Sequence, residues 1–357
     1  MKHYTQLGFI FLLLAMIVIL PVAAADVSTS VVLAKGGGAP PLVMAKWETE
    51  PGAPSLESGD PTHQTLGSQF LPDAVFNGKK YINYYAVVKD EENNGNVLGA
   101  YADVYHPDGS KKYQVHFVQM SKAEGIAAWN AAKDIGIITT PCSCTENSVK
   151  TIDTTGCGDP LFELNKGTAS VWVGVEYIHY CQPDGNYVVK TFAVDKDQNP
   201  SNYLYNTFYY MPVTAAEYDF TGVNYGQVSM GPDLLPKWVA GDTNFLDDDG
   251  FPTVRNVGNT RANIIINQDD MGFGKNSAGV WNVRFDARLG HTGDEPLYDP
   301  DADHLLGDVL ERSHTEEMDF SIHVIKGFEA GKGTMTLRLE NPDALEGPRS
   351  YCLYPLV

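Results

Sequence analysis

Acidic side chains recur at two-residue spacing in two segments of the chain, and this spacing can hold calcium. The first segment holds Asp299, Asp301, Asp303 and the later Asp308, and the second holds Asp247 and Asp249. Carboxylates at the first, third and fifth positions of a loop supply the oxygen ligands that Ca²⁺ prefers. His304 stands where such a loop needs glycine, and Leu310 where it needs glutamate, so the cage would be irregular. A solvated, turn-forming acidic loop is the plainer interpretation, and an irregular calcium site is the alternative that these carboxylates allow.

Cysteines offer a second kind of chemistry. The chain has five: Cys142, Cys144, Cys157, Cys181 and Cys352. In an exported protein, disulfides are the default state of cysteine. Cys142 and Cys144 are too close to pair easily with each other, so each is expected to reach for Cys157 or Cys181. A metal site built from these four thiolates is the alternative, and Cys352 is the candidate for a free or intermolecular thiol.

Motifs that would identify an enzyme are absent from the sequence. It contains no Gly-x-Ser-x-Gly elbow, His-Glu-x-x-His pair, phosphate loop or dinucleotide fingerprint. We therefore assign no catalytic residue and no cofactor other than calcium. The 19 Tyr, 15 Phe and 5 Trp indicate either sandwich cores or a sugar-stacking platform. Exposure of the tryptophans (Trp47, Trp129, Trp172, Trp238 and Trp281) would favour the platform.

The elements that must position these residues are strands. From about Phe70 onward, segments rich in aromatic and β-branched residues alternate with turn residues. Ser170–Tyr180 and Asn186–Val194 read as a hairpin-like pair. A capping box from Ser121 to Glu124 and the stop at Gly136 predict one inserted helix over about 121–135. The predicted fold class is all-β, with two tandem immunoglobulin-like β-sandwiches.

Two stretches carry a resemblance to known modules. Pro183–Val189, Ala193–Asp195 and Tyr105–Ser110 resemble microbial immunoglobulin-like modules, in which a tyrosine early in the penultimate strand ties the corner to the backbone. Tyr218–Val223 and Thr253–Thr260 resemble a second module type, with Thr221 inserted before Gly222. The arrangement is similar to uncharacterised secreted or surface proteins of methanogenic archaea. That resemblance implies a fold and a location, and it supplies no catalytic residues.

The N-terminal residues predict export. Lys2 and His3 precede an apolar run from Gly8 to Leu20 and a small-residue stretch ending at Ala25, the order of a cleaved secretory signal. The run is shorter than the roughly 20 residues of a membrane span, although an uncleaved tether is the alternative. Cleavage after Ala25 would leave 24 basic and 45 acidic residues, a net charge of −21. Such a charge argues against nucleic acid and anionic lipid as partners.

These observations predict five regions: a signal peptide (1–25), a Gly/Pro-rich linker (26–69), sandwiches at 70–212 and 213–342, and a C-terminal tail (343–357). An apolar island within the linker, Leu42–Trp47, is expected to pack and could add an edge strand. The predicted function is non-enzymatic: a secreted or cell-surface structural or adhesive protein of the cell envelope. Expected partners are other envelope proteins or surface polysaccharide, with homo-oligomers through sheet edges or Cys352 as a further expectation. The alternatives are an extracellular carbohydrate-binding protein and a secreted hydrolase.

Overall fold

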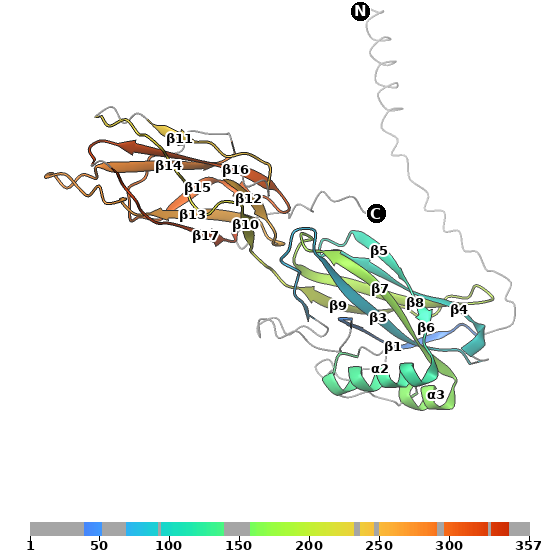
Figure 1. The fold of residues 1–357 in the computed structure, drawn as a ribbon. Helices are drawn as coiled ribbons and strands as arrows, with labels where there is room; N and C mark the ends of the chain where they lie inside the picture. The colour runs from blue at the N-terminus through green and yellow to red at the C-terminus, as the bar shows by residue number, and fades with distance from the viewer. Residues whose placement is uncertain are drawn as a thin grey trace, which may run out of the picture. The chain divides into compact units, whose positions relative to one another are not determined.

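The computed structural model describes residues 39–51, 69–91, 94–138, 158–231, 236–245, 250–290, 296–327 and 330–342. These residues form two β-sandwiches, each with a hydrophobic core of its own (Figure 1). The predicted all-β fold class with immunoglobulin-like sandwiches is confirmed. The predicted signal peptide and C-terminal tail lie outside the described residues. Within the described part of the chain, no helix is long and apolar enough to cross a membrane.

The first sandwich consists of two sheets. One has the order β1 (Leu42–Thr49), β3 (Lys79–Lys89), β7 (Ala169–His179), β6 (Val118–Gln119). The other has the order β2 (Gln69–Phe70), β9 (Leu204–Tyr210), β8 (Gly185–Asp195), β4 (Val97–Tyr105), β5 (Lys111–His116). Neighbouring strands are antiparallel except β2 and β9, and a 3₁₀ turn, Asn94–Asn96, precedes β4.

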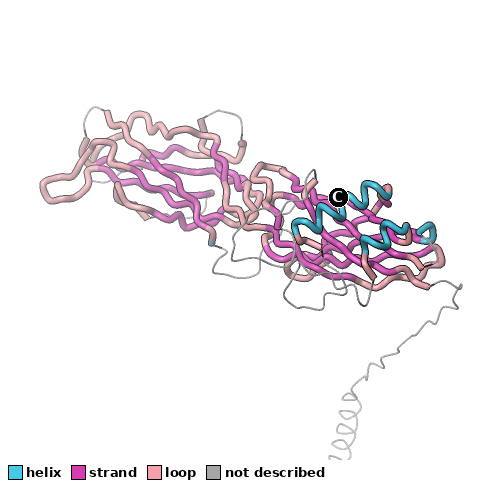
Figure 2. The backbone as a smooth tube through the Cα atoms, turned by 90° about the horizontal axis from the view of Figure 1, so that it is seen from below, coloured by secondary structure: helices cyan, strands magenta, loops and turns pink. Residues whose placement is uncertain are grey.

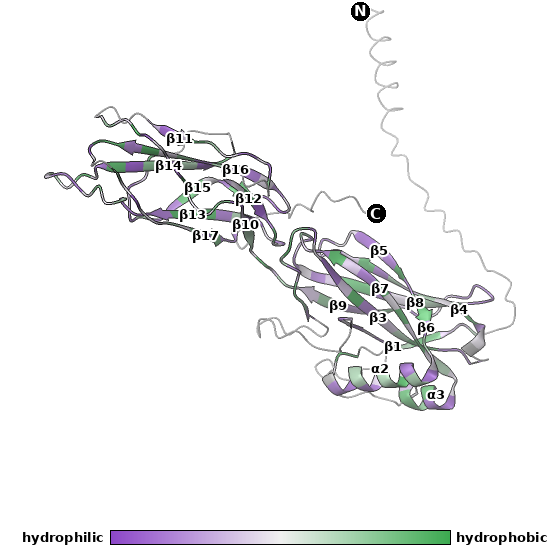
Figure 3. Ribbon diagram, viewed as in Figure 1, coloured by the Kyte–Doolittle hydropathy of each residue, from purple (hydrophilic) through white to green (hydrophobic). Residues whose placement is uncertain are grey.

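Alternation along the strands builds this core. In β8, Tyr187, Val189 and Ala193 are fully buried, whereas Lys190 and Phe192 between them are half-buried. Successive side chains of a strand point to opposite faces of the sheet, so one set fills the space between the sheets and the other faces outward. Hydrophobic and hydrophilic residues are accordingly interleaved along the strands in Figure 3.

Two helices cover the outer face of the sheet that contains β1. The predicted helix is confirmed as α2 (Lys122–Ile135), with the Ser121–Glu124 capping box and Gly136 in the left-handed conformation (φ 75°) at its end. A second helix, α3 (Pro160–Lys166), was not predicted. Both helices lie on one side of this sandwich in Figure 2. Trp129 of α2 packs edge-on against Trp47 of β1, with ring centroids 5.9 Å apart, so β1 is buried on both faces.

The linker prediction for residues 26–69 is wrong over Leu42–Thr49. This segment is β1, an edge strand that pairs antiparallel with β3, so the first sandwich begins well before residue 70. The surrounding Pro and Gly residues concealed the strand. Burial on both faces also removed the alternation by which a half-buried strand is recognised. The edge-strand expectation for Leu42–Trp47 is confirmed.

The hairpin predicted from Ser170–Tyr180 and Asn186–Val194 is also wrong. Both segments are strands, but β7 pairs with β3 and β6, whereas β8 pairs with β4 and β9. The chain therefore crosses from one sheet to the other between them. Tyr187 holds this corner: its hydroxyl donates a 2.9 Å hydrogen bond to the carbonyl oxygen of Pro183, as the resemblance implied.

The second sandwich is built from a group of five strands and a group of three strands. The first group has the order β10 (Ala216–Tyr218), β12 (Thr253–Asn256), β16 (Thr315–Val324), β11 (Lys237–Val239), with β14 (Val283–Leu289) also paired to β16. The second has the order β15 (His304–Leu310), β13 (Ala262–Gln268), β17 (Met335–Glu340). Buried side chains such as Ile264, Phe285 and Phe320 fill the core. Strand β10 ends at Tyr218, so most of the stretch Tyr218–Val223 that resembles the second module type lies outside a strand.

Candidate functional site

The outer face of the five-stranded sheet in the first sandwich carries a line of aromatic rings. His116, Tyr101, Phe192 and Tyr203 cross strands β5, β4 and β8 and the residue before β9, and we call them the aromatic row. Tyr101 stands directly opposite His116 on one side and Phe192 on the other. The ring centroids of successive members are 5.2, 5.4 and 5.5 Å apart. A continuous ring surface thus crosses the sheet.

Strand alternation places these rings on the surface. Ala100, Ala102 and Val104 point into the core, so Tyr101 and its neighbours at two-residue spacing face outward. Tyr101 and Phe192 are half-buried by their neighbours, and His116 is exposed. Tyr203 is 45% exposed, so the row is open to solvent at both ends.

Polar side chains form a second line beside the aromatic row. Gln114, Asp103, Lys190 and Tyr205 stand opposite one another on β5, β4, β8 and β9, and we call them the polar row. Asp103 accepts a 2.8 Å hydrogen bond from Gln114, and its carboxylate lies 2.7 Å from the Lys111 ammonium. Tyr205 is 54% exposed.

Lys190 joins the two rows. Its ammonium lies 3.9 Å from the ring centroid of Tyr203 and 5.8 Å from that of Tyr205, within the range of cation–π attraction. Desolvation alone lowers the pKa of Lys190, but the hydroxyls of Tyr205 and Tyr203 outweigh this effect and the net pKa is raised. The ammonium therefore stays charged at neutral pH.

This arrangement can hold a sugar. An exposed aromatic face stacks on the apolar face of a pyranose ring, while carboxylate, amide and ammonium groups at its side hydrogen-bond the hydroxyls. Successive rings are inclined to one another by 83°, 29° and 56°, so an extended chain on this outer face would meet ring faces and ring edges in turn.

The exposure of the tryptophan side chains does not reveal this aromatic surface. Trp47, Trp129 and Trp172 are buried, Trp281 is half-buried, and Trp238 is 36% exposed. The Arg288 guanidinium lies 4.5 Å from the Trp238 ring centroid. Within the aromatic row, His116 and Tyr203 are the exposed rings, and Tyr101 and Phe192 between them are half-buried. The outward positions of Val97–Tyr105 and Asn186–Val194 contained the signal for the two middle rings.

The first acidic segment does not gather its carboxylates around one point. Asp299 accepts a 2.7 Å hydrogen bond from Arg284. Asp303 contacts Arg338 and accepts a 2.8 Å bond from Asn267. Asp301 lies in a turn with φ 58°, and Asp308 lies within strand β15 rather than in a loop. Arginine thus neutralises two of the four predicted ligands.

Among the residues that the structure describes, no group of three or more His, Cys, Asp or Glu side chains is arranged to hold a metal ion. Asp247 and Asp249 lie outside those residues, so calcium binding at the second acidic segment stays a prediction. His304 stacks on Tyr298 at 4.5 Å, and His314 lies 3.4 Å from Glu316.

Cys181 is buried and disulfide-bonded. Cys142, Cys144, Cys157 and Cys352 lie outside the described residues, so the predicted pairing of Cys181 with one of the first three stays a prediction.

No family model matches the chain, and no curated protein matches it. Among solved structures, the chain is similar to the C-terminal domain of the antigen I/II-family protein AspA of Streptococcus pyogenes, with 11% identity, a TM-score of 0.21, and coverage of 84% of this chain and 96% of that one. It is also similar to the CsuC–CsuE chaperone–tip adhesion subunit complex of Acinetobacter baumannii, with 9% identity, a TM-score of 0.27, and coverage of 76% and 97%. An α-L-rhamnosidase from Dictyoglumus thermophilum has 11% identity, a TM-score of 0.19, and coverage of 78% and 27%. Likenesses this low carry no argument about function.

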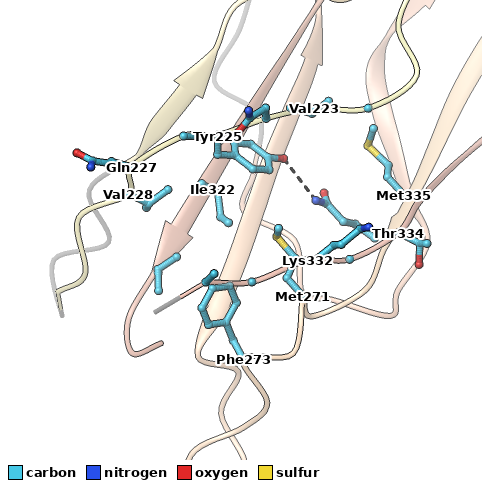
Figure 4. Close-up of a pocket in the computed structure, with 18 of the residues that line it drawn as sticks. Val223, Tyr225, Gln227, Val228, Met271, Phe273, Ile322, Lys332, Thr334 and Met335 are labelled. Carbon is cyan, nitrogen blue, oxygen red and sulfur yellow. Dashed lines mark hydrogen bonds between the residues drawn. The ribbon is translucent and has the colours of Figure 1, made fainter. Parts of the chain in front are cut away.

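A cavity of about 1260 Å³ opens in the second sandwich. Its wall mixes polar and apolar groups, and Val223, Met271, Phe273 and Met335 are among the apolar lining residues drawn in Figure 4. The amide of Gln268 donates a 3.4 Å hydrogen bond to the hydroxyl of Tyr225, drawn as a dashed line there. Among the lining residues that the structure describes, only Lys332 is charged.

Ser321, His323 and Asp286 meet on β16 and β14, and they resemble a hydrolytic triad only in composition. Ser321 Oγ and Asp286 Oδ2 each lie 2.9 Å from the same nitrogen, Nε2 of His323. A catalytic triad needs the serine and the carboxylate on opposite nitrogens of the imidazole. All three side chains are buried, so this cluster is a polar contact between neighbouring strands.

Proposed function

We propose that this protein is a non-enzymatic, secreted or surface-associated adhesive protein of the cell envelope, and that it binds surface polysaccharide through the aromatic and polar rows. The observation that carries the proposal is the aromatic row, whose rings run unbroken across an exposed sheet face. The predicted export signal places such a surface outside the cytoplasm, where polysaccharide is found.

The composition of this face suits a sugar. Tyr101 and Phe192 are half-buried side by side and are lined by Asp103, Gln114 and Lys190. A mixture of ring faces with hydrogen-bonding groups matches a molecule that has apolar ring faces and many hydroxyls. Several weak contacts along one polysaccharide chain would together raise the overall affinity through multivalency.

The test is binding of the purified protein to a panel of cell-surface polysaccharides by affinity electrophoresis. The double variant Tyr203→Ala/Tyr205→Ala removes two exposed rings, each contributing about 1 kcal/mol, and is expected to weaken binding roughly 10-fold to 30-fold.

Tyr81→Ala is the matched control, because Tyr81 is 48% exposed but belongs to β3 in the other sheet. It is expected to leave the affinity unchanged. An equal loss in both variants, or no binding to any member of the panel, would contradict the proposal.

A further inference from the structure

A polar group is buried inside the first sandwich, at the end where β1 faces β9. Lys46 and Glu48 are two residues apart on β1, so their side chains lie on the same face of the strand. Their exposed fractions are 0% and 1%, although Lys and Glu are almost never fully buried without a specific partner. The partner across the gap is Asn206 of β9.

Each of the three side chains contacts the other two. Lys46 Nζ lies 2.5 Å from Glu48 Oε1. Asn206 Nδ2 donates a 2.5 Å hydrogen bond to Glu48 Oε2. Lys46 Nζ also contacts the side-chain carbonyl oxygen of Asn206. The amine therefore lies against the amide group, and one carboxylate bridges the two.

Burial changes the chemistry of the amine. Desolvation lowers the pKa of Lys46, and the charge and hydrogen bond of Glu48 only partly offset this. A neutral amine is a nucleophile, whereas an ammonium is not. Transfer of one proton from Lys46 to Glu48 also removes both charges from a buried site, where separated charges are costly.

We propose that Lys46 and Asn206 become joined by an intramolecular amide bond, with Glu48 as the proton-transfer group. Lys46 Nζ attacks Cγ of Asn206, a new C–N bond forms, and the bond from Cγ to Nδ2 breaks. Glu48 first takes a proton from the Lys46 ammonium and then delivers it to Nδ2. Nδ2 then leaves as ammonia, and Glu48 is again a carboxylate. Nζ releases its second proton when the amide forms, and the ammonia takes up this proton and departs as ammonium. No oxidant, metal or cofactor enters the balance.

The geometry meets the requirements of this reaction. Nucleophile and electrophile are held in contact by two strands of a packed core, so the encounter is intramolecular and the reacting groups are already oriented. The carboxylate touches both the attacking and the leaving nitrogen, as a proton shuttle must. Desolvation is the main cause that raises the pKa of Tyr84 and of Tyr113, and the charge of Glu48 adds a smaller increase to each.

The position of the bond defines its effect. Lys46 and Asn206 are 160 residues apart, on the first and the last strand of this sandwich. A covalent link between these strands would close nearly the whole domain into a loop and restrict its unfolded state, as a disulfide does. It would also carry tension applied through the two ends of the domain without loading the hydrogen bonds between strands. This inference does not depend on the proposed polysaccharide binding.

Mass spectrometry of the purified, reduced protein tests the bond directly. The wild-type chain is expected to be lighter than its sequence requires by about 17 Da, the mass of the ammonia lost. A tryptic digest should contain a branched peptide that joins the segment around Lys46 to the segment around Asn206, with no cleavage after Lys46.

Three variants make the result specific. Lys46→Met and Glu48→Gln preserve side-chain length, and both are expected to have the full mass and no branched peptide. Asn202→Ala is the matched control, because Asn202 also bonds β1, through the backbone of Val43, but has no amine beside it; this variant should retain the mass loss. Full mass in the wild type, or a mass loss without the branched peptide, would overturn the proposal. Retention of the bond in Glu48→Gln would remove Glu48 from the mechanism.

Discussion

The hydroxyl of Tyr187 donates a hydrogen bond of 2.9 Å to the carbonyl oxygen of Pro183, four residues earlier in the chain. The phenol is fully buried, and its ring stacks on Phe208 of β9 with centroids 5.2 Å apart. One residue thus anchors the core and the turn by which the chain passes from β7 in one sheet to β8 in the other. The corner should depend on it more than on any exposed tyrosine.

Replacing Tyr187 by Phe removes the corner hydrogen bond and retains the ring. We expect the free energy of unfolding to fall by about 1–2 kcal/mol, because the Pro183 carbonyl loses its partner in a buried position. Urea unfolding followed by tyrosine and tryptophan fluorescence measures the change. Tyr205→Phe, at an exposed site, should stay within about 0.5 kcal/mol of the wild type, and an equal effect in both variants would refute the special role of the corner.

His106 should make the first sandwich sensitive to mild acid. Desolvation, and to a lesser extent the charge of Lys112, lower its pKa from 6.5 to about 4, against a small opposing effect of Asp108. Between these two values the unfolded chain binds a proton that the folded chain does not, so stability falls as the pH drops through this window. Below about pH 4 the loss is complete.

Melting temperatures measured between about pH 7.5 and about pH 4 test this dependence. His106→Gln should flatten the pH dependence of the melting temperature over this range. If the melting temperature of His106→Gln falls with pH as steeply as that of the wild type, groups other than His106 control the stability in acid.

Gly258 is required by a close approach of two backbone segments. A Cβ there would lie 2.2 Å from the carbonyl oxygen of Val213 and 2.8 Å from the amide nitrogen of Ala215. Gly258→Ala should therefore cost the second sandwich about 1–3 kcal/mol through overpacking. Gly222→Ala is the control, since no atom lies within 4 Å of its added Cβ, and it should be neutral or slightly stabilising. Chemical denaturation of the two variants distinguishes them, and equal stability would contradict the close approach.

Trp129 should hold α2 against the sheet. Its ring is fully buried beside Trp47, so Trp129→Ala should cost about 3–5 kcal/mol and raise amide hydrogen exchange in both α2 and β1. Ser121→Ala, which removes only the helix cap, should cost about 1 kcal/mol and affect exchange in the first turn of α2 alone. Unchanged exchange in β1 on loss of Trp129 would mean that the helix does not protect this strand.

Much of the fold could be predicted because the signals were local. The capping box at Ser121 and the stop at Gly136 specified α2 to within one residue, and the aromatic and β-branched residues of Ser170–Tyr180 and Asn186–Val194 located β7 and β8. The missed elements had weak local signals: α3 is only seven residues long, and β15 lies in a segment whose aspartates suggested a loop. The outward positions of β4 and β8 could have indicated that Tyr101 and Phe192 face solvent. Which rings contact each other could not be predicted, because this depends on which strands pair and in which register.

The amino-acid sequence by itself determined the all-β class and the capped helix, because each depends on the periodicity or hydrogen bonding of adjacent residues. The tyrosine that holds the corner was implied by the resemblance to immunoglobulin-like modules. Only the tertiary structure decided that β7 and β8 lie in different sheets, that Asp299 and Asp303 bind arginines, and that Lys46, Glu48 and Asn206 meet inside the first sandwich. Contacts between residues this far apart in the chain follow from which strands pair and which faces stack. Alternation along a strand predicts which side chains face the core, but it does not predict which residues of another strand they will contact.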